Sequence, residues 1–283
     1  MFLELIDNVA KIAQENAVVS PDDYTNDDGL LVCGKCNVPK QMRITLPEVP
    51  KYTDRVVHVQ CKCAKQQELI EQQELRKNKL DTFIKEWRKK GISDSNYLKY
   101  RFENDDSSHT KISCACRRYA GDFPEMKRRN QGILFCGSIG IGKTFYAGCI
   151  ANHVLEMGIT VLMTNLSSLM NRMMMNSEEK NYVLDQVRTV SLLVIDDLGI
   201  ERDTSFTAEK IYEILTARYH SGKPLIVTTN LTPKSMKECT NDNYKRIYDR
   251  VLEMCHPIVL VGESRRIKIA EEKNKFMKEF LGV

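Results

Sequence analysis

The sequence predicts an α/β fold with a five-stranded parallel sheet, preceded by a small α+β domain. A glycine-rich loop at residues 137–144 joins a short apolar run to a helical segment. Four more apolar runs follow without polar alternation, which is typical of parallel strands that helices cover on both faces. The part before residue 92 instead has alternating segments and two pairs of cysteines, which indicates a separate small domain.

The segment from Gly132 to Thr144, GILFCGSIGIGKT, reads as a buried strand, a loop and the start of a helix. The loop has the G-x-x-x-x-G-K-[ST] spacing of nucleotide phosphate loops. Glycines let backbone N–H groups turn toward phosphate oxygens, and the helix N-terminus adds partial positive charge. We expect Lys143 to reach the β- and γ-phosphates and the Thr144 hydroxyl to complete a Mg²⁺ shell. The predicted nucleotide contacts are Gly137, Ser138, Ile139, Gly140, Ile141, Gly142, Lys143, Thr144 and Phe145.

Composition excludes several classes of protein. The 283 residues suffice for a full core, and 42 basic against 38 acidic residues leave no global signature of polyanion binding. The apolar runs are shorter than the ~18–20 residues that span a bilayer, and the acidic start does not resemble a secretory signal. Ten cysteines in such a chain favour metal or free thiols over disulfides. We therefore expect a cytoplasmic protein with no membrane partner.

The front of the chain predicts a structural zinc site. An amphipathic helix is expected over residues 2–13, followed by a polar stretch. Two cysteine pairs, LVCGKC and HVQCKC, are then separated by segments that alternate like the arms of a hairpin. Four thiolates brought together in this way suit tetrahedral Zn²⁺, although His58 could replace one thiolate and metal-free reduced thiols are the alternative. The predicted ligands are Cys33, Cys36, Cys61 and Cys63.

Residues 64–90 predict one long helix, because they are rich in Gln, Glu, Lys and Leu and lack Gly and Pro. The last turn is basic, and Gly91 is expected just beyond the helix end. We place an N-terminal zinc- and partner-binding domain at 1–91, a linker at 92–104 and an ATPase domain at 105–283. An apolar stripe on the helix suits a partner-binding arm. It consists of Leu69, Ile70, Leu75, Leu80, Phe83, Ile84 and Trp87.

A methionine-rich segment follows the second strand of the expected sheet. Residues 165–188 have helical periodicity and include Met170, Met173, Met174 and Met175. Methionines at helical spacing usually fill a core, but they also make adaptable contact surfaces. The sequence leaves both alternatives open.

The motif LLVIDDLG is an apolar run that ends in Asp196 and Asp197. Such a run is typical of a buried parallel strand with acids at its carboxyl end. If this strand neighbours the phosphate-loop strand, Asp196 is expected to hold Mg²⁺ together with Thr144. Asp197 would then orient the attacking water as general base. The pair therefore predicts hydrolysis of a bound nucleoside triphosphate.

Polar and basic residues follow the last strands. Asn230 ends the run PLIVTTN, where it either fixes the γ-phosphate and water or simply begins a turn. Arg246 and Arg250 lie on an expected helix, and GESRR places two more arginines after the last strand. An arginine can stabilise charge on a transferring phosphoryl group within its own subunit or in a neighbour. The spacing alone does not rank these arginines.

From about residue 100 to the C-terminus, the chain resembles helicase loaders of the DnaC/DnaI type, within the IstB-like ATPases of the AAA+ class. The resemblance rests on FEND, GSIGIGKT, LLVIDDLG, TTNL, KRIYDR and GESRR, and the front cysteines match the family's zinc domain more loosely. It implies an AAA+ P-loop NTPase fold, and the variants on phages and mobile elements look most similar. It implies a sensor-1 role for Asn230, an arginine-finger role for Arg250 and a sensor-2 role for Arg266. Asp197 stands where many AAA+ proteins have Glu, which suggests slow, partner-dependent hydrolysis.

The resemblance also implies cofactors and partners. It implies ATP, Mg²⁺ and Zn²⁺, an ATP-dependent oligomer with single-stranded DNA in its channel, and docking of a replicative hexameric helicase by the front domain. The expected function is ATP-dependent loading of the replicative DNA helicase onto single-stranded DNA during DNA replication. The alternatives are an IstB-like transposition helper ATPase and a nucleotide-gated adaptor with little turnover. A zinc-plus-helix front domain favours the loader.

Overall fold

The computed structural model describes residues 19–44, 55–106, 109–199 and 204–282. The chain divides into two compact units, residues 1–80 and 81–283, and the division falls inside helix α2 (Lys62–Gly91). The amphipathic helix predicted for residues 2–13 lies outside the described part. Among the described helices, none is both long enough and apolar enough to span a bilayer.

The first unit contains two small antiparallel pairs of strands and the beginning of α2. Strand β1 (Tyr24–Thr25) pairs with β2 (Leu31–Val32), and β3 (Gln41–Ile44) pairs with β4 (Arg55–His58). The second pairing confirms the predicted hairpin arms. One cysteine pair follows β2, and the other lies at the start of α2, with Cys61 just before the helix and Cys63 in its first turn.

Helix α2 confirms the long helix predicted for residues 64–90 and corrects its end. Gly91 lies in the last turn of the helix rather than beyond it, and it is buried. A Cβ at this position would come within 2.0 Å of the Val161 carbonyl oxygen, so close packing against the sheet explains the glycine. Phe83 and Trp87 pack against the core of the second unit. The apolar residues earlier in the helix are exposed: Leu69, Ile70, Leu75 and Leu80.

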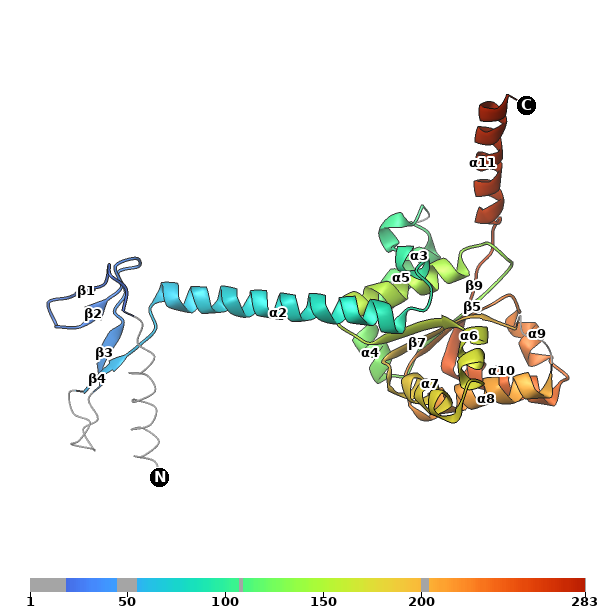
Figure 1. Cartoon of the computed structure of the whole chain (residues 1–283), viewed down its shortest axis with the longest axis horizontal. Helices are drawn as coiled ribbons and strands as arrows, with labels where there is room; N and C mark the ends of the chain where they lie inside the picture. Colours follow the sequence, from blue (N-terminus) through green and yellow to red (C-terminus); the bar gives the residue numbers. More distant parts are fainter. Residues whose placement is uncertain (1–18, 45–54, 107–108, 200–203, 283) are drawn as a thin grey trace. The chain divides into compact units, whose positions relative to one another are not determined.

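The second unit is built on the predicted five-stranded parallel sheet (Figure 1). The order of its strands is β6-β7-β8-β5-β9. The strands are β5 (Gly132–Cys136), β6 (Val161–Asn165), β7 (Leu192–Leu198), β8 (Leu225–Thr229) and β9 (Cys255–Val259). Strand β8 lies between the phosphate-loop strand β5 and the aspartate strand β7. From the sequence, we considered β7 as the direct neighbour of β5 in the sheet. That arrangement is wrong, because the chain crosses over and β8 lies between the two strands.

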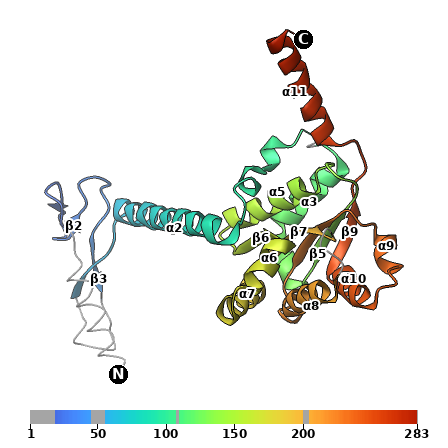
Figure 2. The same cartoon turned by 45° about the vertical axis from the view of Figure 1, so that its right-hand side comes forward.

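Helices cover both faces of this sheet, which explains why its strands do not alternate. Successive residues of β5 enter opposite cores: Ile133 and Phe135 pack on one face, and Leu134 and Cys136 on the other. Figure 2 shows the two helical layers. The first layer contains α3 (Lys111–Gly121) and α5 (Lys143–Glu156). The second contains α6 (Leu166–Met173), α7 (Ser177–Thr189), α8 (Ser205–His220) and α10 (Asp242–Met254).

Shorter elements and the last helix complete the unit. They are the 3-10 turns η2 (Tyr97–Lys99) and η3 (Phe102–Asn104), α4 (Phe123–Arg128), α9 (Pro233–Lys237) and α11 (Arg265–Leu281). Residues 92–104, predicted as a linker, contain η2 and η3. Ile92, Tyr97 and Phe102 are buried in the core that α5 covers. The polar turn residues that suggested a linker instead form tight turns between these buried anchors.

The methionine-rich segment divides between core and surface. Asn176 separates two helices, because its side chain accepts the backbone N–H of Glu179 and caps α7. Met173 is buried in the core, whereas the side chains of Met174 and Met175 are 52% and 72% exposed. Core filling is therefore confirmed for Met173, and the contact surface stays a prediction for Met174 and Met175.

Candidate functional site

The glycine-rich loop joins β5 to α5 and leaves the start of that helix open. Gly142 is the N-cap residue and has φ = 100°, a left-handed conformation that glycine adopts without steric cost. Among the described residues, no side chain caps this end of α5. Its first backbone N–H groups and the positive end of its dipole are therefore available to an anion.

Lys143 reaches back across the loop. Its ammonium group donates to the carbonyl oxygens of Gly137 at 2.9 Å and Ser138 at 2.7 Å, and to Oδ1 of Asn230 at 2.7 Å. The residue is only 5% exposed, and burial lowers the pKa of Lys143 against the opposing pull of the Asp197 and Asp196 carboxylates. The structure thus brings together Lys143 and Asn230, which the sequence predicted for one site.

Three hydroxyl groups hold the carboxylate of Asp196. Thr144 Oγ1 donates to Oδ1 at 2.9 Å, and Thr228 Oγ1 donates to the same oxygen at 2.6 Å. The Tyr97 hydroxyl donates to Oδ2 at 3.0 Å. Carboxylate and hydroxyl oxygens are the ligands that Mg²⁺ prefers, and a carboxylate has lone pairs beyond these three bonds. Thr144 and Asp196 therefore fit a magnesium ion, although β8 separates the strands that carry them.

A bulge at the end of β7 sets the direction of Asp197. Ile195 pairs with Val227 and Leu198 with Thr229, so two residues of β7 oppose the single Thr228. Asp197 has φ = 59°, and its backbone N–H donates to Thr228 Oγ1 at 2.9 Å. Burial, followed by the nearby charge of Asp196, raises the pKa of Asp197, while Lys143 and Arg266 oppose this shift. The second carboxylate of the pair thus lies in the electrostatic field of both basic residues.

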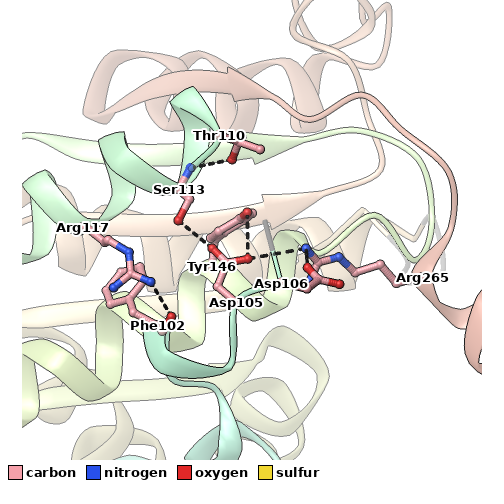
Figure 3. Close-up of polar contacts among 8 residues, drawn as sticks. All are labelled: Phe102, Asp105, Asp106, Thr110, Ser113, Arg117, Tyr146 and Arg265. Atoms are coloured by element: carbon pink, nitrogen blue, oxygen red, sulfur yellow. Dashed lines mark hydrogen bonds and ion pairs between the residues drawn. The ribbon is translucent and has the colours of Figure 1, made fainter. Parts of the chain in front are cut away.

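The beginning of α11 contacts the phosphate loop. The Arg265 backbone N–H donates to the Gly140 carbonyl oxygen at 3.0 Å. Its guanidinium donates to Asp106 Oδ1 at 2.6 Å (Figure 3). The same guanidinium lies 5.4 Å from the centre of the Phe145 ring. Asp105, next to Asp106, accepts the Ser113 hydroxyl at 2.6 Å. The GESRR and FEND motifs therefore meet beside the loop.

Arg250 is held elsewhere, between helices α10 and α8. Its guanidinium donates to the Tyr212 hydroxyl at 2.8 Å and to the Thr216 hydroxyl. It also lies 4.4 Å from the centre of the Tyr212 ring, and Tyr219 contributes a second ring at 5.4 Å. The structure therefore places Arg250 against α8, whereas Lys143, Asp196, Asp197 and Asn230 meet around the loop.

A family model agrees with this geometry. Residues 118–273, more than half of the chain, match the model described as IstB-like ATP binding protein. The chain belongs to the IstB-like ATP-binding family. This membership and the assembled loop indicate that the chain binds ATP.

Curated relatives of this IstB-like chain include replicative helicase loaders. DnaC of Buchnera aphidicola subsp. Acyrthosiphon pisum is 28% identical over 164 residues, which are 55% of this chain and 64% of that protein. DnaI of Bacillus subtilis is 25% identical over 150 residues, 49% of this chain and 48% of that protein. An ATP-binding protein of a Mycobacterium tuberculosis insertion sequence is 24% identical over 141 residues, 48% and 56% of the two chains. The chain thus spans about half to two thirds of these relatives.

A solved structure supports the AAA+ fold of this IstB-like chain. The crystal structure of a DnaC helicase loader matches with a TM-score of 0.50 and 26% identity, over 59% of this chain and 100% of that one. With the five-stranded parallel sheet, this match confirms the predicted AAA+ architecture and the resemblance to DnaC/DnaI-type loaders.

The four predicted zinc ligands form a cluster in the first unit. Their sulfur atoms all lie within 4.8 Å of one another, and Cys63 Sγ lies 3.3 Å from Cys33 Sγ and 3.5 Å from Cys61 Sγ. A backbone N–H bond from Cys63 lowers the pKa of Cys36 to about 6, which favours its thiolate, while thiol contacts with Cys36 and Cys33 raise the pKa of Cys63 to about 12. His58 instead lies 3.3 Å from the Gln41 amide nitrogen. The four cysteines are therefore compatible with one tetrahedral zinc ion.

Removing metal is expected to unfold the first unit, because the binding free energy of a structural zinc site is part of its folding free energy. Metal analysis of the full chain should give about one Zn²⁺, and a chelator should expose the α2 region to proteolysis. The double variant Cys61→Ser/Cys63→Ser should lose the metal. The matched control is Cys114→Ser, at an exposed thiol on α3, which should keep it. Zinc retained by the double variant would place the site elsewhere.

Three residues at the nucleotide site were not predicted. Thr228 carries a weak signal, because it is a polar residue near the end of an apolar strand, as Asn230 is. Arg265 was noted within GESRR but not selected over its neighbour Arg266. Tyr97 carries no signal, since it lies in the turn-rich segment interpreted as a linker.

Proposed function

We propose that this IstB-like chain is an ATP-dependent loader of the replicative DNA helicase, with slow hydrolysis that partner or DNA stimulates. The observation that carries the proposal is the paired geometry of Lys143 with Asn230 and of Thr144 with Asp196 around one open helix start. Two relatives of this chain are replicative helicase loaders, and this similarity supports a loader over other ATP-binding functions.

Each residue then has a proposed role. The loop from Gly137 to Phe145 binds the phosphates of ATP, and Lys143 neutralises charge on the β- and γ-phosphates. Thr144 and Asp196 hold Mg²⁺, and Asp197 accepts the proton of the attacking water. Asn230 contacts the γ-phosphate in place of its present contact with Lys143. Arg266, whose positive charge acts on both Lys143 and Asp197, responds to the bound nucleotide.

Residues 1–91 are proposed to bind the helicase, and residues 105–283 to bind ATP and single-stranded DNA as an oligomer. Exposed apolar residues on α2 support the first assignment, because exposed apolar side chains suit a partner interface. A metal bound by the four cysteines would keep strands β1 to β4, which precede α2, folded. The segment 92–104 lies between these two parts of the sequence and packs into the core of the second unit.

A binding experiment with the full chain tests the loader. The tagged protein should capture a purified hexameric replicative helicase from the same host. A Leu69→Glu/Leu75→Glu variant should weaken this binding, because charge in an apolar interface is costly to desolvate. The matched control Glu68→Gln/Glu74→Gln alters the same helix without adding charge and should bind normally.

A transposition helper is the second candidate, because one relative belongs to an insertion sequence. If the chain ignores the helicase and captures a transposase, the helper replaces the loader. Hydrolysis measured with and without single-stranded DNA separates both candidates from an adaptor with little turnover.

Arg250 is proposed to act across a subunit interface, as a finger on the ATP of the neighbouring chain. Arg250→Ala and Lys143→Ala proteins should each be inactive, and their mixture should recover part of the ATPase rate. Recovery follows because one interface then pairs an intact loop with an intact Arg250. Arg246→Ala, on the same helix, is the control and should stay active. A mixture that co-assembles yet remains inactive would reject this role.

A further inference from the structure

We infer that Tyr97 is a positioning residue, which orients the Asp196 carboxylate for the magnesium ion of the ATP site. The inference rests on the proposed function, because it takes Asp196 as a ligand of that ion. Its basis is the 3.0 Å hydrogen bond from the Tyr97 hydroxyl to Asp196 Oδ2, made by a tyrosine that is 7% exposed. Tyr97 lies outside all the motifs of the nucleotide site.

The two oxygens of Asp196 are held from different directions. Oδ1 accepts hydroxyl donors from Thr144, at the start of α5, and from Thr228, on β8. These two bonds share one oxygen and leave the other without a threonine donor. Tyr97 donates to that other oxygen, so a turn of the carboxylate about its Cβ–Cγ bond would break hydrogen bonds at both oxygens. Groups that hydrogen-bond to metal-ligating carboxylates commonly orient them in this way.

Tyr97 can do this because its backbone is itself anchored. The Asn152 amide nitrogen donates to the carbonyl oxygens of Tyr97 at 2.7 Å and Tyr100 at 2.8 Å, and Asn152 is buried. Helix α5 also approaches this segment closely, since a Cβ on Gly148 would lie 2.5 Å from Tyr100 Cδ2. Turn η2 is therefore fastened to the same helix that begins with Lys143. Helix α5 therefore connects the phosphate loop, at its start, to Tyr97, which holds the Asp196 carboxylate.

The anchoring also extends to the sheet. The Ser93 backbone N–H donates to the Met163 carbonyl oxygen at 3.0 Å, and Ile92 bridges to Met163. The segment from residue 92 to Tyr97 thus connects β6 to the metal-holding carboxylate. Because this segment is anchored at both α5 and β6, the Tyr97 hydroxyl is suited to orienting the Asp196 carboxylate rather than to reacting with the substrate.

The test is a magnesium titration of the full chain. The signal measured at each Mg²⁺ concentration is the binding of a fluorescent ATP analogue, which should increase as Mg²⁺ is added. In Tyr97→Phe, the Mg²⁺ concentration at half-maximal gain should rise roughly 10-fold, as for loss of a group that supports a metal ligand. Binding of the analogue in EDTA should not change, which also shows that the variant is folded. The matched control is Tyr119→Phe, which loses a 2.6 Å bond to the Gln131 carbonyl oxygen in the same helical layer. It should keep the wild-type Mg²⁺ dependence.

Asp196→Asn separates failure of this inference from failure of the proposed site. If Asp196→Asn shifts the Mg²⁺ dependence and Tyr97→Phe does not, the positioning role is rejected and the magnesium site stands. If neither variant shifts it, the assignment of Asp196 as a ligand fails as well. Equal shifts in Tyr97→Phe and Tyr119→Phe would show a general packing effect and also reject the inference.

Discussion

Lys143→Ala is expected to abolish ATP binding at concentrations that saturate the wild-type protein. The substitution removes the one ammonium group that Gly137, Ser138 and Asn230 hold inside the loop. Removing one partner of a buried charged contact costs about 2–5 kcal/mol, so the affinity should fall at least about 30-fold. Binding of a fluorescent ATP analogue measures the loss directly.

A second lysine that donates to backbone carbonyl oxygens, the half-buried Lys223, provides the matched control for this experiment. Lys223 also donates to two backbone carbonyl oxygens, those of Arg188 at 2.9 Å and Thr189 at 2.7 Å. These contacts lie at the end of α7 and not at the phosphate loop. Lys223→Ala should therefore keep its ATP affinity, even if its melting temperature falls. Equal losses of affinity in both variants would mean that Lys143 acts only through stability.

Asp197→Asn is expected to keep Mg²⁺–ATP binding and to lose turnover. An amide cannot accept the proton of the attacking water, and a general base contributes about 10²- to 10⁴-fold to rate. The backbone should tolerate the change, because asparagine adopts the left-handed conformation of this position as readily as aspartate does. Steady-state ATPase assays, with binding measured on the same preparation, separate the two effects.

Asp185→Asn is a suitable control, since it makes the same chemical change at an exposed position of α7. It should hydrolyse ATP at the wild-type rate. If Asp197→Asn does so too, Asp197 is not the base.

Local pattern was enough to predict the sheet and much of the site. The phosphate loop and the acids of β7 carry chemistry in consecutive residues, so spacing alone located Lys143 and Asp196. The four zinc candidates were predictable for the same reason. Each pair of cysteines lies within a few residues of sequence, and such pairs are typical of structural zinc sites. The family model matches residues 118–273, which are most of the second unit.

The remaining features depend on contacts between distant parts of the chain. Strand order is a property of crossovers, so no local pattern indicated that β8 separates β5 from β7. Tyr97 lies 99 positions before Asp196, in a segment whose composition resembles a linker. The partners of Arg250 likewise come from another helix, α8, and the sequence does not show that they enclose its guanidinium.

The position of β8 sets the width available to a reacting phosphate. Neighbouring strands lie about 4.8 Å apart, so the ends of β5 and β7 are separated by about 10 Å rather than about 5 Å. An attacking water must stand about 3–3.5 Å from the phosphorus, on the side away from the leaving oxygen. In the proposed reaction, a separation of two strand spacings would leave room for the phosphoryl group and the water in line, whereas one spacing would leave room for only one of them. The inserted strand also places the Thr228 hydroxyl on Asp196 and, just after its end, the Asn230 amide oxygen on Lys143.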